Sequence, residues 1–310
     1  MKKIVYIGGM RALIEYLILN IKFLEETIFF LEYDFKVNLI EKIYLKEKNP
    51  RDISRYKNYK ILKKYTFTNE EKEFWIQDHL RYSPFFMGNF KNIKLLEDGL
   101  GNYTEVNKKI NKRIKYSIKS WMLGGTFKVD RRRFGNSESI SEIYLTGIRE
   151  IPQEIENKVK IVNLKKQWDS LIKIEKEKIL NIFGLDKSIL ESLKNKKVIL
   201  ITQPLSEEGT ITEIEKVEIY EKILLKYDIN EVLIKAHPRE ETNYKKYFKE
   251  IAILDKSIPM ELISFLVSDL KEVVTIFSTA VFEFKNICKI TFVGTKINEK
   301  IYNRYGDIEK

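Results

Sequence analysis

The sequence predicts an α/β protein made of two tandem domains, each with a parallel sheet and flanking helices. The chain opens with an apolar strand at Ile4–Ile7, a tight turn at Gly8–Gly9 and a helix with apolar spacing over Ala12–Leu24, which is a common start for such a sheet. A second alternation of strand and helix begins at Val198–Thr202. The length of 310 residues is sufficient for two domains of ordinary size.

Short apolar runs between turn residues predict the other strands. They are Thr27–Leu31, Ile61–Phe67, Ile93–Leu96, Ile143–Leu145, Val159–Val162, Val232–Ile234, Ile251–Leu254, Val273–Phe277 and Thr291–Val293. Helical spacing predicts helices over Trp168–Phe183, Ser188–Leu193, Ile211–Tyr227 and Met260–Val267. A charged helical stretch near residues 165 to 195 joins the two alternations, so we divide the chain into an N-terminal domain, 1–165, and a C-terminal domain, 166–310.

The composition excludes a disordered chain and narrows the range of partners. Hydrophobic residues make up 44% of the sequence and aromatic residues 12%, so a core can be buried. The formal net charge of +11 fits nucleic acid, an anionic membrane surface or a phosphate-bearing substrate, and equally a lysine-rich genome. The single cysteine, Cys288, cannot form an intramolecular disulfide. We find no signal-peptide pattern and no window of about 20 uncharged apolar residues, so we expect a cytoplasmic protein.

The first candidate site is an acidic pair that follows the predicted strand Ile93–Leu96. Glu97 and Asp98 precede Gly99 in a glycine-rich turn. One of two adjacent carboxylates can point into a cleft while its neighbour points away, and a partly desolvated carboxylate can act as a general base. The glycine permits a positive φ and the close approach of a substrate. The same residues also fit an ordinary acidic turn.

Further candidates follow strands of the C-terminal half. His237, in the run Lys235-Ala236-His237-Pro238-Arg239, can donate a proton or a hydrogen bond to a phosphate, or it can be a turn histidine satisfied by backbone. Ser278 and Thr279 open a predicted helix, where hydroxyls and free amides can cap the helix and bind a phosphate. Glu261, at the start of another helix, can accept hydrogen bonds from ribose hydroxyls or serve as a first-turn acid.

Several common site patterns are absent from the sequence. There is no Asp-x-Asp to hold a metal and a sugar diphosphate, no Walker loop, no Gly-x-Gly-x-x-Gly and no Gly-x-Ser-x-Gly. The two histidines, His79 and His237, lie far apart in the sequence, which disfavours a zinc site. We therefore expect neither a metal ion nor a cofactor.

Three of these segments, in their order along the chain, resemble the three short motifs of the bacterial sialyltransferases of glycosyltransferase families 38, 52 and 80. They are Glu97-Asp98-Gly99, His237-Pro238 and Ser278-Thr279. The strand and loop over Lys197–Gly209 are most similar to family 52, the lipooligosaccharide sialyltransferases. The resemblance implies a GT-B fold, in which two Rossmann-like domains face each other across a cleft. It places the acceptor and the catalytic base in domain 1–165 and the CMP-binding site in domain 166–310.

The resemblance also implies roles for individual residues. Asp98 is then the general base, and His237 contacts the phosphate leaving group and can act as a general acid. The residues expected to bind substrate are Glu97 and Gly99 beside the base, Lys235 near the nucleotide, Pro238 against the cytosine, Glu261 on the ribose, and Ser278 and Thr279 on the phosphate. The implied reaction is an inverting, metal-independent transfer of sialic acid from CMP-sialic acid to a galactose-type hydroxyl of lipooligosaccharide or capsule.

Other interpretations stay open at this point. The same fold can use another activated sugar, such as a UDP-hexose, or the chain can be an inactive relative. A basic α/β protein can also bind nucleic acid without being an enzyme, although we find no module of interleaved aromatic and basic residues. The basic stretch over residues 108–119 can bind an anionic membrane or pack its isoleucines on the core, and Arg131-Arg132-Arg133 adds charge nearby. The resemblance further hints at a homodimer.

Overall fold

The structure, a computed structural model, describes residues 1–33, 36–45, 54–104, 113–267, 269–285 and 287–308. It consists of two compact units, Met1–Ile182 and Phe183–Lys310. The boundary between the units therefore lies after Ile182, further along the chain than the division between residues 165 and 166. Each unit is described by itself below.

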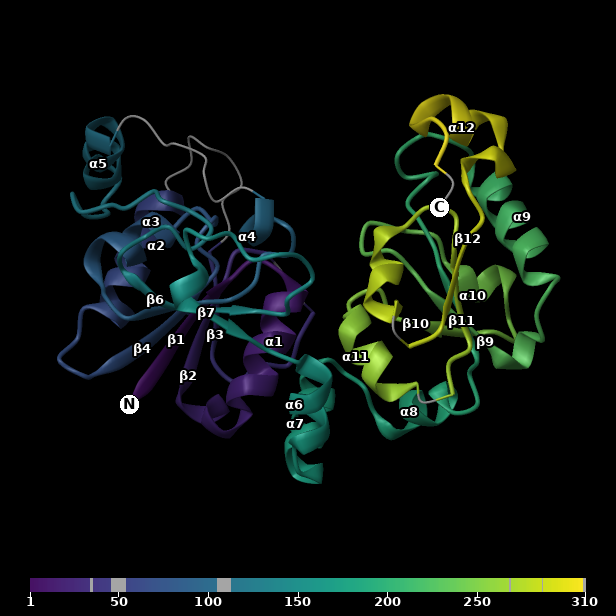
Figure 1. The fold of residues 1–310 in the computed structure, drawn as a ribbon, viewed down its shortest axis with the longest axis horizontal. Helices are drawn as coiled ribbons and strands as arrows, with labels where there is room; N and C mark the ends of the chain where they lie inside the picture. The colour runs from purple at the N-terminus through teal and green to yellow at the C-terminus, as the bar shows by residue number, and fades with distance from the viewer. Residues whose placement is uncertain (34–35, 46–53, 105–112, 268, 286, 309–310) are drawn as a thin grey trace. The chain divides into compact units, whose positions relative to one another are not determined.

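The first unit is built on a seven-stranded parallel sheet with the strand order β3-β2-β1-β4-β5-β6-β7 (Figure 1). Its strands are β1 (Lys2–Ile7), β2 (Thr27–Leu31), β3 (Lys42–Tyr44), β4 (Lys72–Ile76), β5 (Ile93–Leu95), β6 (Ile140–Leu145) and β7 (Val159–Ile161). The chain runs outward from β1 to β3 and then returns to the other side of β1 at β4. Open α/β sheets bind ligands beyond the carboxyl ends of the strands at such a reversal.

Both faces of this sheet are covered, which explains why its central strands are continuously apolar. The helices of the unit are α1 (Met10–Asn20), α2 (Ser54–Thr66), α3 (Ser83–Asn89), α4 (Gly101–Thr104), α5 (Arg113–Met122), α6 (Leu164–Ser170) and α7 (Lys173–Ile182), with 3₁₀ turns η1 (Ile21–Glu26) and η2 (Glu156–Lys158). Ile4 and Tyr6 pack in one core cluster with side chains of α2 and α3. On the other face, Tyr16 of α1 contacts the rings of Phe29 and Trp75.

The second unit has a five-stranded parallel sheet with the order β10-β9-β8-β11-β12. Its strands are β8 (Val198–Ile201), β9 (Val232–Lys235), β10 (Ala252–Leu254), β11 (Glu272–Thr275) and β12 (Lys289–Phe292). Its helices are α8 (Lys187–Leu193), α9 (Glu213–Leu224), α10 (Tyr244–Tyr247), α11 (Met260–Leu266) and α12 (Glu299–Tyr305), with 3₁₀ turns η3 (Ile229–Glu231), η4 (Thr279–Phe284) and η5 (Thr295–Ile297). Here the strand order reverses between β8 and β11.

The predicted parallel α/β architecture is confirmed, and three local predictions are corrected. Residues Ile61–Phe67 do not form a strand, because Tyr59, Leu62 and Thr66 make the buried face of helix α2. The helix expected over Trp168–Phe183 is two helices, since Leu171 has an extended backbone between α6 and α7. Two short strands of the first sheet, β3 and β4, were not predicted; each begins with one or two charged residues and has only two or three apolar residues after them.

Candidate active site

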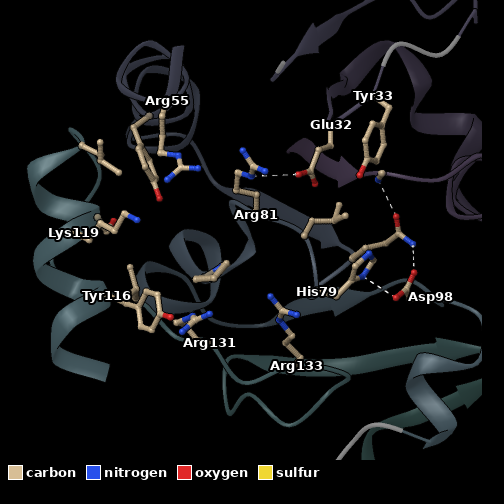
Figure 2. Close-up of a pocket in the computed structure, with 18 of the residues that line it drawn as sticks. Glu32, Tyr33, Arg55, His79, Arg81, Asp98, Tyr116, Lys119, Arg131 and Arg133 are labelled. Carbon is tan, nitrogen blue, oxygen red and sulfur yellow. Dashed lines mark hydrogen bonds and ion pairs between the residues drawn. The ribbon is translucent and has the colours of Figure 1, made fainter. Parts of the chain in front are cut away.

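A pocket of about 510 Å³ lies beyond the carboxyl ends of the strands in the first unit (Figure 2). The segments that follow β1, β4 and β5 contribute Gly8 and Gly9, Gln77 and His79, and Asp98 respectively. Since β1 and β4 are the neighbouring strands at which the order reverses, the pocket lies where a ligand site is expected in this type of sheet.

The carboxylate of Asp98 faces the imidazole of His79 in this pocket. Its Oδ2 lies 2.9 Å from Nδ1 of His79, and Nε2 of Gln77 donates to its Oδ1 at 3.4 Å (Figure 2). The backbone N–H of Asp98 donates to Oδ1 of Asn102 at 2.6 Å, which fixes the turn. The Asp98 side chain keeps 30% of its surface exposed, so the protein orients the carboxylate and leaves it accessible.

His79 is a site residue that the sequence analysis missed. Its ring lies parallel to that of Phe134, with a centroid separation of 6.4 Å. The loop of Phe134 is held in turn by Asp78, whose Oδ2 accepts the N–H of Gly135 at 2.8 Å. Burial raises the pKa of Asp78 to about 6. The signal in the sequence was an Asp-His pair after a strand, but that strand, β4, had not been predicted.

Glu97 points away from the pocket, which corrects the expectation that it binds substrate. Its side chain is fully buried. Oε2 accepts hydrogen bonds from the backbone N–H of Thr146 at 2.6 Å and from its hydroxyl at 2.7 Å, and Nη2 of Arg11 lies 3.5 Å from Oε1. Glu97 therefore ties the end of β5 to the end of β6. The expectation that one carboxylate of the pair points into a cavity and the other away is confirmed.

Gly99 has a φ of +56°, as the glycine-rich turn predicted. A side chain there would meet nothing within 4 Å, so the backbone conformation alone favours glycine. At Gly101, a Cβ would lie 2.5 Å from the ring of Phe134, the residue that stacks on His79. A contact between Gly99 and substrate stays a prediction.

In the second unit, His237 follows β9 in a loop that fixes its tautomer. The backbone N–H of Arg239 donates to Nδ1 of His237 at 3.1 Å. Because Nδ1 accepts, the neutral ring carries its proton on Nε2. Burial, together with the nearby positive charge of Arg239, lowers the pKa of His237. The imidazole is therefore neutral at pH 7 and presents an Nε2–H that can donate to a phosphate oxygen.

A buried ionic network supports this loop. The carboxylate of Glu240 is fully buried and accepts the backbone N–H of His237 at 2.7 Å and the hydroxyl of Tyr244 at 2.6 Å. The ammonium of Lys216, also fully buried, lies 3.3 Å from Glu240 and 2.8 Å from Glu207. Two carboxylates thus share one buried cation, and the shared network fixes the backbone of His237.

The contribution of this network to the free energy of unfolding depends on pH, because Glu207 titrates at a lower pH in the folded chain. Burial raises the pKa of Glu207, but hydrogen bonds from Lys216 and from the backbone of Glu241 together lower it by more. The net result is a fall in the pKa from 4.5 to about 2. The unfolded chain then binds more protons than the folded chain between these values. The contribution to the free energy of unfolding is therefore complete above pH 4.5 and is lost as the pH falls toward 2.

We expect Glu207→Gln to flatten the curve of unfolding free energy against pH in that window, because the shifted carboxylate is gone. Urea unfolding at a series of pH values measures it. The matched control is Glu218→Gln, an exposed residue of α9, which should keep the slope of the parent protein. An unchanged slope in Glu207→Gln contradicts the assignment.

Lys235 is buried beneath the loop and does not face outward. Its Nζ donates to the backbone carbonyls of Ala236 and Lys256, each at 3.0 Å. Burial lowers its pKa to about 8. Its amine thus joins two backbone segments below the loop of His237, and a position near the nucleotide stays a prediction.

Ser278 and Thr279 follow β11, as predicted, and Ser278 caps the turn after it. Its Oγ accepts the N–H of Ala280 at 3.3 Å. The helix that follows is the six-residue 3₁₀ segment η4. Oε1 of Gln203 accepts the N–H of Phe277 at 3.1 Å and so joins the ends of β8 and β11. The capping prediction is confirmed, and phosphate binding stays a prediction.

The two remaining predicted residues differ in exposure. Pro238 is exposed beside His237, whereas Glu261 is 7% exposed in the first turn of α11. Their contacts with cytosine and ribose stay predictions. Asp98 belongs to the first unit and His237 to the second. Within the described residues, no group of three or more His, Cys, Asp or Glu side chains is arranged to hold a metal ion.

Two parallel α/β sheets, each with polar side chains at the carboxyl ends of its strands, define a two-domain Rossmann-like protein of the GT-B type. The family model of glycosyltransferase family 52 matches residues 26–300. The chain belongs to glycosyltransferase family 52, which confirms the resemblance drawn from its three motifs. It is accordingly a glycosyltransferase.

Other proteins are similar to this chain in sequence or in fold. An uncharacterized protein of Haemophilus influenzae is 35% identical over 240 residues, which cover 77% of this chain and 74% of that protein. The fold is similar to that of an α/β-galactoside α-2,3-sialyltransferase from Photobacterium phosphoreum, with a TM-score of 0.58, 16% identity and coverage of 98% of this chain and 94% of the other. A 2,6-sialyltransferase from Photobacterium sp. JT-ISH-224, solved with CMP and lactose, gives a TM-score of 0.60 and 13% identity over 93% and 71% of the two chains.

Proposed function

We propose that this glycosyltransferase transfers sialic acid from CMP-sialic acid to a glycan hydroxyl, with inversion and without a metal ion. The observation that carries the proposal is the carboxylate of Asp98, held by His79 and Gln77 in an accessible pocket at the strand-order reversal. The two Photobacterium sialyltransferases, one of them solved with CMP and lactose, support this choice of donor and acceptor.

The chemistry assigned to each residue follows from its surroundings. Asp98 takes the proton from the acceptor hydroxyl as the oxygen attacks the anomeric carbon, and His79 keeps the carboxylate oriented. Attack from the side opposite to the departing CMP is a single displacement, which inverts the anomeric centre. His237 donates its Nε2–H to the phosphate of the leaving group, and hydrogen bonds of this kind stabilise the developing charge without a divalent ion.

The proposed function is tested with purified protein and lactose as acceptor. CMP-sialic acid is compared with UDP-glucose and UDP-galactose, each with and without EDTA. We expect release of CMP that depends on the acceptor and persists in EDTA. Release of UDP instead would replace this proposal with the UDP-hexose alternative, and loss of activity in EDTA would contradict metal independence.

His237→Ala is expected to lower kcat/KM by about 10²-fold, the lower end of the effect of one positioned acid or donor. Because His237 is assigned to the nucleotide, the variant should also bind CMP more weakly. His79→Ala is the matched control, since it removes the other histidine of the chain and should leave the Kd for CMP unchanged. Calorimetric titration with CMP measures the Kd of both variants. An equal loss of CMP affinity in the two variants contradicts the division of roles.

We also propose that α5 brings the enzyme to an anionic membrane surface. Lys108, Ile110 and Lys112 of the basic stretch lie outside the described residues, and helix α5 begins at Arg113. Four large apolar side chains are exposed on it at the spacing of one helix face, by 72, 45, 65 and 71% respectively: Ile114, Ile118, Trp121 and Met122. Ser117 and Ser120 form the buried face instead. Ile114 and Ile118 therefore do not pack on the core of this unit.

Flotation with vesicles tests the membrane contact. We expect the protein to float with vesicles that contain phosphatidylglycerol. Each of the single variants Ile118→Ser and Trp121→Ser should partition at least about tenfold less, because an exposed apolar side chain that enters lipid contributes roughly 1.5–3 kcal/mol. Ile214→Ser, at an exposed isoleucine of α9, is the control. Equal binding to neutral vesicles contradicts the charge component. In the described part of the chain no helix combines the length and apolarity needed to cross a bilayer.

A further inference from the structure

The pocket of the first unit carries a strong excess of positive charge. Five cationic side chains line it, against two carboxylates. The cations are Arg55, Arg81, Lys119, Arg131 and Arg133, and the carboxylates are Glu32 and Asp98 (Figure 2). The two carboxylates already have partners, because Glu32 lies 4.0 Å from Arg81 and Asp98 lies 2.9 Å from His79.

Three of the cations, Lys119, Arg131 and Arg133, have no carboxylate partner among the described residues, and we call them the basic wall. Arg131 is positioned by an aromatic ring, since its guanidinium carbon lies 3.4 Å from the ring centre of Tyr116. Lys119 and Tyr116 lie one turn apart on α5. The basic wall is therefore assembled by the close packing of α5 against the segment of Arg131.

Arg132 shows that this arrangement is selective. Its guanidinium turns to Asp130 at 2.7 Å and to Glu138 at 2.8 Å, so the middle arginine of the run is neutralised by carboxylates. The two arginines on either side line the pocket. The backbone thus directs two charges of three toward the cavity, where neither forms an ion pair with a carboxylate of the described residues.

A neutral sugar does not need such a wall. Sugar hydroxyls are bound by groups that both donate and accept hydrogen bonds, whereas arginine and lysine only donate and are specific for carboxylate and phosphate. Cations brought together without counter-charges repel one another, and an anion in the pocket relieves that repulsion. The chemistry of the basic wall therefore fits a ligand with a carboxylate or a phosphate.

The charged groups of the donor do not account for the whole wall. In CMP-sialic acid, the carboxylate and the phosphate are both attached to the anomeric carbon, so they lie beside the bond that Asp98 helps to form. Lys119 and Arg131 lie at the end of the pocket opposite to Asp98 and His79 (Figure 2). A group that reaches them is remote from the reacting hydroxyl and so belongs to the acceptor.

We infer that the acceptor is an anionic glycan, with a carboxylate or phosphate on the sugar next to the one that receives sialic acid. This inference rests on the proposed function and adds a substrate class to it. The basic wall binds the anionic group while Asp98 meets the hydroxyl of the terminal sugar.

The test compares three disaccharides that differ in the group at carbon 6 of the glucose unit, which is neutral in one and anionic in two. They are lactose, the same disaccharide with glucuronic acid in place of glucose, and the same disaccharide with a 6-phosphate on its glucose. We expect kcat/KM for at least one charged disaccharide to exceed that for lactose by about tenfold, the factor that corresponds to one hydrogen bond to a charged group. The better of the two charged compounds identifies the anion.

Lys119→Gln with Arg131→Gln should lower that preference to about twofold or less, because charge-assisted hydrogen bonds to the anion are lost. Lys60→Gln, at an exposed lysine of α2 that does not line the pocket, is the control and should keep the preference. A parent protein that uses lactose as well as both charged disaccharides overturns the inference while leaving sialyl transfer intact.

Binding measured by titration calorimetry keeps the inference testable if no disaccharide is sialylated. The charged disaccharides should then bind the parent protein more tightly than lactose and lose that advantage in the double variant. Absence of CMP release with tight, charge-dependent binding would reject the proposed activity alone. Binding that is equal for all three compounds would reject the anionic acceptor.

Discussion

Asp98→Asn is expected to lower kcat by about 10²–10⁴-fold, the range that a positioned general base contributes. The amide has nearly the same shape as the carboxylate, but it cannot take the proton of the acceptor hydroxyl. The substitution is isosteric in a side chain that is partly exposed, so the fold should be retained. Initial rates of CMP release measure the effect, and the thermal unfolding midpoint confirms the fold.

A double-mutant cycle separates the base from the residue that orients it. If His79 acts through Asp98, which lies 2.9 Å away, then His79→Ala lowers kcat on its own but adds little in the Asp98→Asn background. Asp169→Asn, at an exposed aspartate of α6, is the control for a lost carboxylate. Parent-level turnover in Asp98→Asn would remove Asp98 from the mechanism, and full additivity would give His79 an independent role.

Lys216→Met is expected to lower the free energy of unfolding by about 3–5 kcal/mol, as removal of one partner from a buried ionic network does. The variant leaves Glu240 and Glu207 close together without the buried cation they share. Because Glu240 accepts the backbone N–H of His237, binding of CMP should weaken as well. Urea unfolding and calorimetric titration measure the two effects.

Lys165→Met is the matched control for this large effect. Lys165 pairs with Asp169 on α6, and both side chains are more than half exposed. An exposed pair of this kind contributes ~0.2–1 kcal/mol, so its loss should be hard to detect. The double variant Lys216→Met with Glu240→Gln should recover part of the lost stability, since it removes one of the two uncompensated charges. A loss below about 1 kcal/mol in Lys216→Met contradicts the network.

The sequence predicted those site residues that directly follow a buried strand. Strand β5 ends before Glu97 and Asp98. Because side chains alternate between the two sides of an extended chain, the carboxylate of Glu97 is buried and that of Asp98 faces the pocket. The same logic located His237 after β9 and Ser278 after β11. These positions follow from local apolar pattern and turn residues, which a single sequence displays.

What the sequence could not give were contacts between segments far apart in the chain. The pairing of His79 with Asp98 depends on β4 and β5 being neighbours in the sheet, and β4, which begins with Lys72 and Glu73, was not predicted. The partners of Lys235 were also hidden, because a lysine at a strand end looks available, whereas here two backbone carbonyls hold its amine. Such partners arise only from the folded arrangement.

Helix α5 should unfold locally more easily than the central strands of the sheet. Its inward side is formed by Ser117 and Ser120, and the described large apolar residues of the helix stay outside the core. Little apolar surface therefore opposes local unfolding of this segment, which should exchange its amide hydrogens long before the central strands do. Since α5 carries Tyr116 and Lys119 into the pocket wall, a bound ligand should slow that exchange by mass action. Occupancy of the pocket can thus be followed in real time on the backbone of one helix.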